Sequence, residues 1–234
     1  MKKLLLSTTA AVLLSVGAYA QGGLGYGVKA GVNLPSYSYG GSDLSDSKST
    51  VNFHVTGYLD APVTSNFYIQ PGVSLQGKGA KFADYKIGEN TYEVKQNTMW
   101  LEVPVNFVLK FPTAGEGKFF VGAGPYVSFG LSGKNKYEAK SGSGSTSVSD
   151  DFKFGKDETL KGTDFGVNFL AGYQLGSGIS INAGYGLGLT NIAGSKFIGK
   201  GDVKNRVWSI GLIRNLIKRI KILIKSFKIK PLLF

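Results

Sequence analysis

The chain has no cysteine, a single histidine and only seven prolines among its 234 residues. Without cysteine it cannot build a disulfide scaffold, bind a metal through thiolates, use a cysteine nucleophile or carry a lipidated N-terminal cysteine. One histidine excludes a two-histidine zinc motif. The low proline content and a hydrophobic content of 42% argue against a collagen-like or disordered chain. We therefore expect neither a metal nor a cofactor.

Charged residues make up only 18% of the chain, and most of its net charge of +12 lies at the two ends. Lys2 and Lys3 stand at the start, and residues 213–234 hold seven basic residues and no acidic one. The segment 21–212 holds 18 basic and 15 acidic residues, so it is nearly balanced. It has no basic stripe with interleaved aromatics, which a nucleic-acid surface needs. We predict that the protein does not bind nucleic acid.

Residues 1–20 have the pattern of an export signal. A short basic region precedes the mostly apolar stretch 4–16, which is short for a membrane-spanning helix. Ala18-Tyr19-Ala20 fits the small-x-small cleavage rule and places the cut before Gln21. An uncleaved N-terminal anchor is the alternative, but the small residues favour cleavage. The mature chain is therefore expected to leave the cytoplasm.

Apolar residues recur with period two along most of the chain. In 119–131, the odd positions include Val121, Val127 and Phe129, whereas the even positions are mostly glycine, serine and tyrosine. Such alternation predicts β-strands with one apolar face. The predicted strands are 24–34, 51–61, 67–78, 99–111, 119–131, 165–175, 179–190 and 205–212. No apolar run of about 20 residues follows the signal, so no spanning helix is predicted.

The connections between these strands alternate in length. The short turns are 62–66, 112–117 and 176–178. The long polar loops are 35–49, 80–97, 133–161 and 192–204, and 141–149 is of low complexity. Short turns at one end and long loops at the other are typical of outer-membrane barrels. Because every backbone polar group must be paired in hydrocarbon, the sheet must close. We predict an all-β fold: a closed antiparallel eight-stranded up-and-down transmembrane β-barrel, monomeric, in the outer membrane.

Seven polar residues fall on the inward face by parity or lie beside it. They are Lys29, His54, Asp60, Lys78, Glu102, Asn106 and Lys110. One interpretation is a selective pore lining, and the other is an ion-paired interior that fills the barrel. Eight strands leave little room for a channel, which favours the second. His54 is the only candidate imidazole base, but no neighbouring residue identifies a nucleophile, so we expect no catalytic residue and no enzyme activity.

Four motifs suggest a family. Phe67-Tyr-Ile-Gln-Pro-Gly72, Leu101-Glu-Val-Pro-Val-Asn106, Phe120-Val-Gly-Ala-Gly-Pro-Tyr126 and Tyr185-Gly-Leu-Gly-Leu-Thr-Asn191 resemble the PorT-like outer-membrane β-barrel family of Bacteroidota. The resemblance covers about 22–212 and implies an outer-membrane barrel. Most members have no assigned activity, and the secretion role of PorT itself would transfer only by fold-level analogy.

Two functional classes follow from this interpretation. The first is an outer-membrane barrel with a structural, adhesive or interaction role through its external loops. The alternative is a transport or protein-export component, or a small-solute channel, for which the inward charges are the motivation. The expected partners are outer-membrane lipid, the barrel-assembly machinery and an unidentified external ligand.

The last 22 residues differ from the body of the chain. Residues 213–234 contain no glycine, and apolar residues such as Ile213, Leu216 and Ile220 follow helical spacing. This pattern indicates a basic amphipathic helix suited to an anionic membrane surface. The competing interpretation is a frameshift product, since an Ile/Lys/Leu-rich sequence is what out-of-frame AT-rich DNA encodes. The barrel domain is therefore predicted to end at Leu212.

Overall fold

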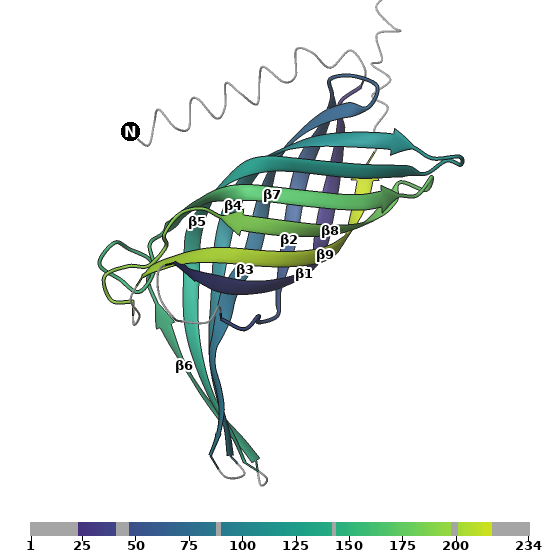
Figure 1. Ribbon diagram of the computed structural model, residues 1–234. Helices are drawn as coiled ribbons and strands as arrows, with labels where there is room; N and C mark the ends of the chain where they lie inside the picture. The colour runs from purple at the N-terminus through teal and green to yellow at the C-terminus, as the bar shows by residue number, and fades with distance from the viewer. Residues whose placement is uncertain (1–22, 41–46, 88–89, 142–143, 198–200, 217–234) are drawn as a thin grey trace, which may run out of the picture.

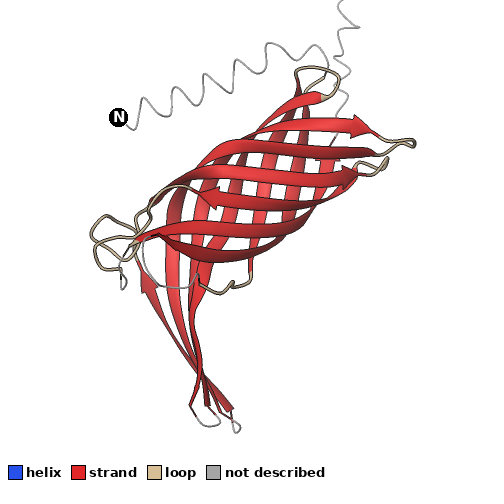
Figure 2. Cartoon of the chain, viewed as in Figure 1, coloured by secondary structure: helices blue, strands red, loops and turns tan. Residues whose placement is uncertain are grey.

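The computed structural model describes residues 23–40, 47–87, 90–141, 144–197 and 201–216, which form an all-β structure (Figures 1 and 2). The strands in these ranges are β1 (Gly25–Gly40), β2 (Asn52–Pro62), β3 (Phe67–Ile87), β4 (Asn90–Pro112), β5 (Lys118–Ser141), β6 (Gly144–Phe152), β7 (Thr163–Gln174), β8 (Ile179–Gly188) and β9 (Asp202–Leu216). Within them, no helix is long and apolar enough to cross a membrane. The predicted signal 1–20 and residues 217–234 of the predicted tail lie outside the described residues.

Eight of the strands close into a ring. The order is β1-β2-β3-β4-β5-β7-β8-β9, every neighbouring pair is antiparallel, and β9 pairs back with β1. Apart from β6, each strand pairs with the one that follows it in the chain, as in an up-and-down barrel. The predicted eight-stranded closed antiparallel barrel is confirmed.

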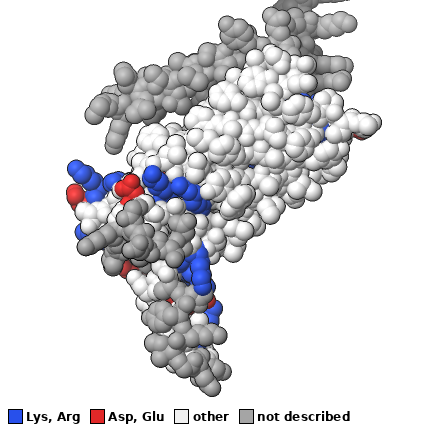
Figure 3. Space-filling view, in the orientation of Figure 1, with Lys and Arg blue, Asp and Glu red and all other residues white. Residues whose placement is uncertain are grey.

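The outer wall of the ring is apolar. On β9, Trp208, Ile210 and Leu212 are each about 60% exposed, whereas the alternate residues Val207 and Ile213 are buried. Figure 3 shows a barrel surface almost free of charge, with lysines and arginines gathered mainly at one end and on the projection beside it. Period-two alternation therefore places large apolar side chains toward lipid and polar ones toward the interior.

One end of the ring carries short turns. They join β2 to β3, β4 to β5 and β7 to β8, and each contains only four or five residues outside the strands. β1 begins and β9 ends at this same end, where Tyr26 is paired with Leu216. The ring therefore opens and closes on the side of the short turns, as the sequence predicts.

The opposite end carries a projecting arm in place of two predicted loops. The segments 80–97 and 133–161 were expected to be loops, but β3, β4 and β5 extend through most of these residues and β6 pairs with β5 (Figure 1). The arm consists of 79–87, 90–98, 132–141 and β6. The alternation of apolar residues does not predict these strands, because both of their faces carry polar residues.

A cap covers the same end of the ring. It consists of residues 153–162 and 189–197, which are joined by the hydrogen bonds Lys161 N to Ile192 O (2.8 Å) and Gly194 N to Thr159 O (3.0 Å). Leu160 and Ile192 of the cap are completely buried against the ring. Their cluster also includes Tyr37, Ala80, Trp100 and Val203. An apolar plug therefore fills the mouth of the barrel beneath the cap.

The closing seam is longer than the sequence suggests. β9 runs from Asp202 to Leu216, four residues beyond the predicted end of the barrel domain at Leu212. It pairs with β1 from Tyr26–Leu216 to Gly40–Asp202 without a register shift. The start of the predicted amphipathic tail is therefore strand, and both edges of the closing strand are paired along most of its length.

Candidate functional site

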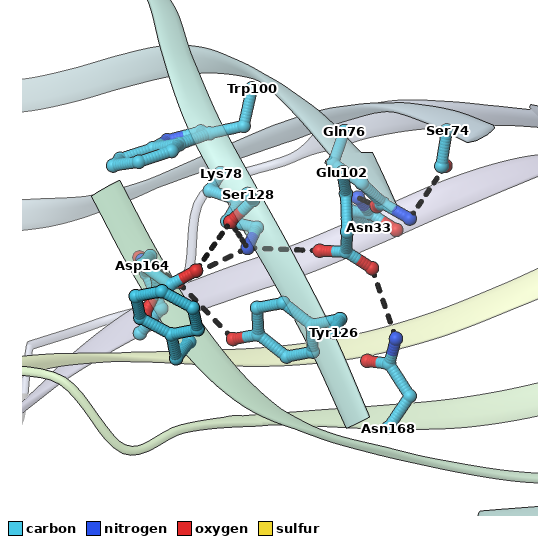
Figure 4. A network of polar contacts seen from close by, with 12 residues as sticks. Asn33, Ser74, Gln76, Lys78, Trp100, Glu102, Tyr126, Ser128, Asp164 and Asn168 are labelled. Atoms are coloured by element: carbon cyan, nitrogen blue, oxygen red, sulfur yellow. Dashed lines mark hydrogen bonds and ion pairs between the residues drawn. The ribbon is translucent and has the colours of Figure 1, made fainter. Parts of the chain in front are cut away.

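The centre of the barrel holds an ion cluster around Lys78. Its Nζ lies 3.1 Å from Glu102 Oε2 and 3.2 Å from Asp164 Oδ2, and the side chains of all three residues are at most 4% exposed (Figure 4). The same ammonium donates to Ser128 Oγ at 3.2 Å and lies 4.5 Å from the centre of the Tyr126 ring. A buried charge is tolerated only when it is paired and hydrogen-bonded. The cluster meets this condition by drawing on β3, β4, β5 and β7.

Neutral side chains complete the cluster. Asn168 Nδ2 donates to Glu102 Oε1 at 3.0 Å, while Tyr126 OH and Asn205 Nδ2 donate to Asp164 Oδ2 at 3.2 and 2.8 Å. These residues come from β5, β7 and β9, and two of the three hydrogen bonds join strands that are not neighbours in the ring. The interior at this level is therefore cross-linked by side chains.

His54 belongs to a separate hydrogen-bond chain. Its Nδ1 lies 2.7 Å from Asn33 Oδ1, and Asn33 Nδ2 donates to Gln76 Oε1 at 2.8 Å and to Gly77 O at 3.0 Å. Since the amide oxygen of Asn33 can only accept, His54 Nδ1 carries the proton. The bare Nε2 is buried without a hydrogen-bond partner among the described residues, and the side chain is only 1% exposed.

A second ion pair lies nearer the short turns. Lys110 Nζ bonds to Asp60 Oδ2 at 2.5 Å, and Gln70 Nε2 donates to Asp60 Oδ1 at 2.9 Å. The Lys110 ammonium also lies 3.9 Å from the centre of the Tyr68 ring. Beside it, Val108, Phe120 and Ile213 form a buried apolar cluster. The interior therefore carries both a paired charge and packed apolar side chains at this level.

A small cavity of about 80 Å³ lies inside the barrel. Lys29, Asn106 and Asn182 line it, together with Lys78 and Glu102 of the central cluster. Lys29 Nζ lies 3.2 Å from the Asn182 amide oxygen when that amide is oriented to satisfy both of its ends. With a volume enough for only a few water molecules, the cavity is a pocket in a filled interior.

The arm combines an ionic face with an apolar one. On the ionic face, Glu93 pairs with Lys81 at 3.1 Å and with Lys95 at 2.6 Å, and Lys95 also reaches Glu138 at 3.1 Å. The hydrogen bond from Lys95, aided by one from Lys81, lowers the pKa of Glu93 to about 2. Hydrogen bonds from Lys136 and Lys95 lower the pKa of Glu138. These contacts tie three strands of the arm together.

The other face of the arm carries exposed apolar side chains. Val94, Tyr137 and Val148 lie opposite one another on β4, β5 and β6, so they share this face. Tyr137 is 47% and Val148 63% exposed. Among the residues that the structure describes, β6 pairs only with β5, so its second edge is open along Gly144–Phe152.

A model of the family described as "Outer membrane protein beta-barrel domain" matches residues 19–194. The chain belongs to this family. The protein is therefore an outer-membrane β-barrel. Since the short turns of such barrels face the periplasm, the arm and cap lie on the external side. The match ends before β9, the strand that closes the ring.

Solved structures of other barrels are similar to the chain at low identity. Ail, the attachment invasion locus protein of Yersinia pestis, is 15% identical, with 83% of this chain and 99% of that chain covered and a TM-score of 0.38. Neisserial surface protein A is 13% identical, with 82% and 97% covered and a TM-score of 0.41. The N-terminal barrel domain of Pseudomonas aeruginosa OprF is 11% identical, with 81% and 97% covered and a TM-score of 0.27. No curated protein matches the chain.

The structure brings together four of the seven predicted interior residues as two pairs. Lys78 contacts Glu102, and Lys110 contacts Asp60. His54, Lys29 and Asn106 lie elsewhere in the interior: His54 bonds to Asn33, and the other two line the cavity. Among the described residues, the ion pairs and hydrogen bonds place these residues in separate groups, and their role as one polar network stays a prediction.

Sequence reasoning missed the most connected acid of the interior, Asp164. It stands one position before the predicted strand 165–175, but β7 begins at Thr163, which places Asp164 on the inward face. Extending the alternation of that strand by one residue would have found it. The same alternation places Asn33 and Tyr126 on the inward face, but neither carries a charge that would single it out.

Proposed function

We propose that the protein is a surface interaction protein, in which the barrel is a membrane anchor and the external arm contacts a partner. The observation that carries this proposal is the arm itself, which has an open β6 edge and an exposed apolar face at Tyr137 and Val148. Natural proteins usually protect an edge strand with proline, lysine or a bulge. Residues 144–152 contain neither proline nor lysine, and their pairing with β5 has no register shift.

The mode of contact that fits this edge is strand addition. A partner segment in extended conformation would bond to the backbone of β6, with its alternate side chains meeting the two faces of the arm. Ser141 and Gly144 close a two-residue hairpin, so they form a hydrogen-bonded pair. Alternation along the strand then directs the backbone groups of Ser145, Ser147 and Ser149 toward the open edge.

The test uses proline at one of these outward positions. Ser147→Pro removes an N–H from the open edge but no bond to β5. Ser147→Thr is the matched control because it keeps the N–H. Bacteria displaying each chain are compared for autoaggregation and for adherence to immobilised extracellular proteins. We expect Ser147→Pro to lose adherence and Ser147→Thr to retain it. Equal adherence of all three chains, or none by the parent chain, would refute the proposal.

The alternative function, a channel or export component, has less support. The apolar plug under the cap, the Lys78 cluster and the apolar cluster at Val108 and Phe120 occupy successive levels of the interior. Conductance in planar lipid bilayers discriminates the two functions. We expect no reproducible channel steps from the purified protein, and a stable open level would favour transport.

Several finer properties belong to this proposal. We take the protein to be a monomer that is exported, cleaved before Gln21 and inserted by the barrel-assembly machinery, and to have no catalytic activity. N-terminal sequencing of the purified outer-membrane protein tests the cleavage site. Membership of the PorT-like group of Bacteroidota rests on the four motifs that span Phe67–Asn191. A His54→Ala variant that retains adherence would support the non-catalytic assignment.

A further inference from the structure

The outward face of β9 changes from apolar to basic residues near its external end. Leu212, Ile210 and Trp208 follow one another on the lipid-facing side and are highly exposed. The next two outward residues are Arg206 and Lys204, both half-buried on the protein surface. Along one strand, the lipid-facing wall therefore passes from apolar to basic within a few residues.

The neighbouring strands supply matching groups at the same level. By register, Ser36 lies opposite Arg206 and Ser38 opposite Lys204 on β1. Directly opposed residues share a face, so two hydroxyls flank the two cations. On the other side, Tyr185 of β8 is opposite Trp208, and their ring centres are 4.6 Å apart. An aromatic pair is therefore placed directly beneath a group of hydrogen-bond donors.

The arginine of this group is held in place. Arg206 Nη1 donates to Gly188 O at 2.6 Å and to Asn205 O at 2.9 Å. A guanidinium has five N–H donors, so these contacts leave others for a ligand. No ion pair joins Arg206 or Lys204 to an acid within the described ranges. The nearest acid along the same face is Asp202, which accepts a hydrogen bond from Asn191 at 2.8 Å.

We propose that Lys204, Arg206, Ser36 and Ser38 bind the phosphate group of an anionic lipid in the outer leaflet. Guanidinium and ammonium groups form charge-assisted hydrogen bonds to phosphate, and hydroxyls add neutral donors. The acyl chains of the same lipid lie against Trp208 and Tyr185, at the level where aromatic side chains meet the membrane interface. A free phosphate ion would contact only the cations and hydroxyls. A phospholipid would contact these groups through its phosphate and the aromatic pair through its acyl chains.

The opposite end of the same strand provides an internal control. Arg214 also faces outward on β9, but its neighbours by register are Val28 and Ile179. It therefore has the same charge, strand and face without the flanking hydroxyls. General attraction of a cation to anionic lipid predicts equal contributions from Arg214 and Arg206. A built phosphate site predicts that Arg206 dominates.

The experiment measures lipid binding to the full chain. Purified protein in neutral detergent micelles is titrated with phosphatidylglycerol, phosphatidylcholine or inorganic phosphate, and bound lipid is counted by native mass spectrometry. We expect one phosphatidylglycerol to be retained, with binding about tenfold weaker in Lys204→Gln/Arg206→Gln. Arg214→Gln should bind like the parent chain. Ser36→Ala/Ser38→Ala should weaken binding to a smaller extent. This variant still tests the site if Lys204→Gln/Arg206→Gln fails to fold.

Three outcomes would overturn the proposal. Undiminished phosphatidylglycerol binding by Lys204→Gln/Arg206→Gln would remove the cations from the site. Equal losses in Arg214→Gln and the double variant would reduce the effect to general charge attraction. Equal retention of phosphatidylcholine, or full competition by inorganic phosphate, would show that an anionic lipid is not the preferred ligand.

Discussion

Lys78 and Asp164 lie 86 positions apart in the chain, yet Lys78 Nζ and Asp164 Oδ2 are 3.2 Å apart in the middle of the barrel. The pair joins β3 to β7 across the interior. With Glu102, the cluster has two carboxylates for one ammonium, and Lys29 is the additional cation that faces the same interior. The formal charges of Lys29, Lys78, Glu102 and Asp164 cancel, as do those of the separate pair between Lys110 and Asp60.

Because one ammonium is shared by two carboxylates, removing the ammonium should lower the free energy of unfolding more than removing one carboxylate charge. Lys78→Met leaves two buried carboxylates facing each other, whereas Asp164→Asn keeps the ion pair between Lys78 and Glu102. We expect Lys78→Met to lower the free energy of unfolding by about 3–5 kcal/mol and Asp164→Asn by less. Urea unfolding in lipid vesicles, followed by heat-modifiable gel mobility, measures both. Lys196→Met is the control, since its pair with Glu158 is exposed and should contribute about 0–1 kcal/mol.

The ionic face of the arm predicts a loss of local stability in acid. The folded-state pKa of Glu93 is about 2 against an ordinary value of 4.5, and that of Glu138 is also lowered. A depressed carboxyl pKa stabilises the folded arm above the ordinary value, and this contribution is lost as the pH falls from about 4.5 toward 2. Amide hydrogen exchange on β4 and β5 should therefore accelerate over this window. Glu93→Gln should already exchange faster at neutral pH and respond less to acid; an unchanged pH profile would contradict the assignment.

Gly27 is predicted to be intolerant of a side chain. A Cβ at this position would lie 2.5 Å from the Tyr58 ring, whose hydroxyl is held by Asn215 at 2.6 Å. Gly27→Ala should therefore cost about 1–3 kcal/mol of unfolding free energy through overpacking. Gly57→Ala is the matched control, because nothing lies within 4 Å of its added Cβ. Comparable urea midpoints for the two variants would show that Tyr58 can move.

The seam predicts where the chain can be shortened. β9 completes its pairing with β1 at Leu216, so deleting 217–234 leaves every described pair of the ring intact. We expect this truncated chain to assemble with unchanged heat stability. Deleting 210–234 should abolish assembly, because much of β1 would lose its partner in lipid. If removal of 217–234 alone prevents assembly or membrane location, the tail is a functional element and the frameshift interpretation is wrong.

Period-two alternation was enough to predict the ring but not the arm. Strands such as β7 and β8 must present apolar residues to lipid at alternate positions, and this requirement is visible in the sequence. The arm meets water on both faces, so Lys134, Lys136 and Glu138 occupy one face, and the other mixes a few apolar residues such as Tyr137 and Val148 with polar ones. Ion pairs and backbone hydrogen bonds join these strands, and the few apolar residues are too sparse to give a clear period of two in the sequence.

The sequence predicts which side chains point into the barrel, but it does not predict which of them contact one another. Parity correctly directs Lys78, Glu102 and His54 inward, since it follows from the pleat of a single strand. Which of them meet depends on the register between strands, and that is fixed by side-chain fit such as Gly27 against Tyr58. Asp164 shows the effect of a misplaced strand boundary: the predicted strand 165–175 begins two residues after the observed start of β7 at Thr163, so the central acid was missed.

The pairing of β1 with β9 means that the ring can close only when nearly the whole chain is present. β1, the first strand of the ring, therefore has one unpaired edge until β9, the last strand, is in place. A chain that stops earlier is an open sheet with two rows of unpaired amides and carbonyls, which hydrocarbon does not tolerate. The entropic cost of joining such distant ends grows only slowly with chain length, so distance itself is a minor obstacle. We therefore expect a chain that ends before β9 to be unstable in the membrane, however many of the earlier strands it contains.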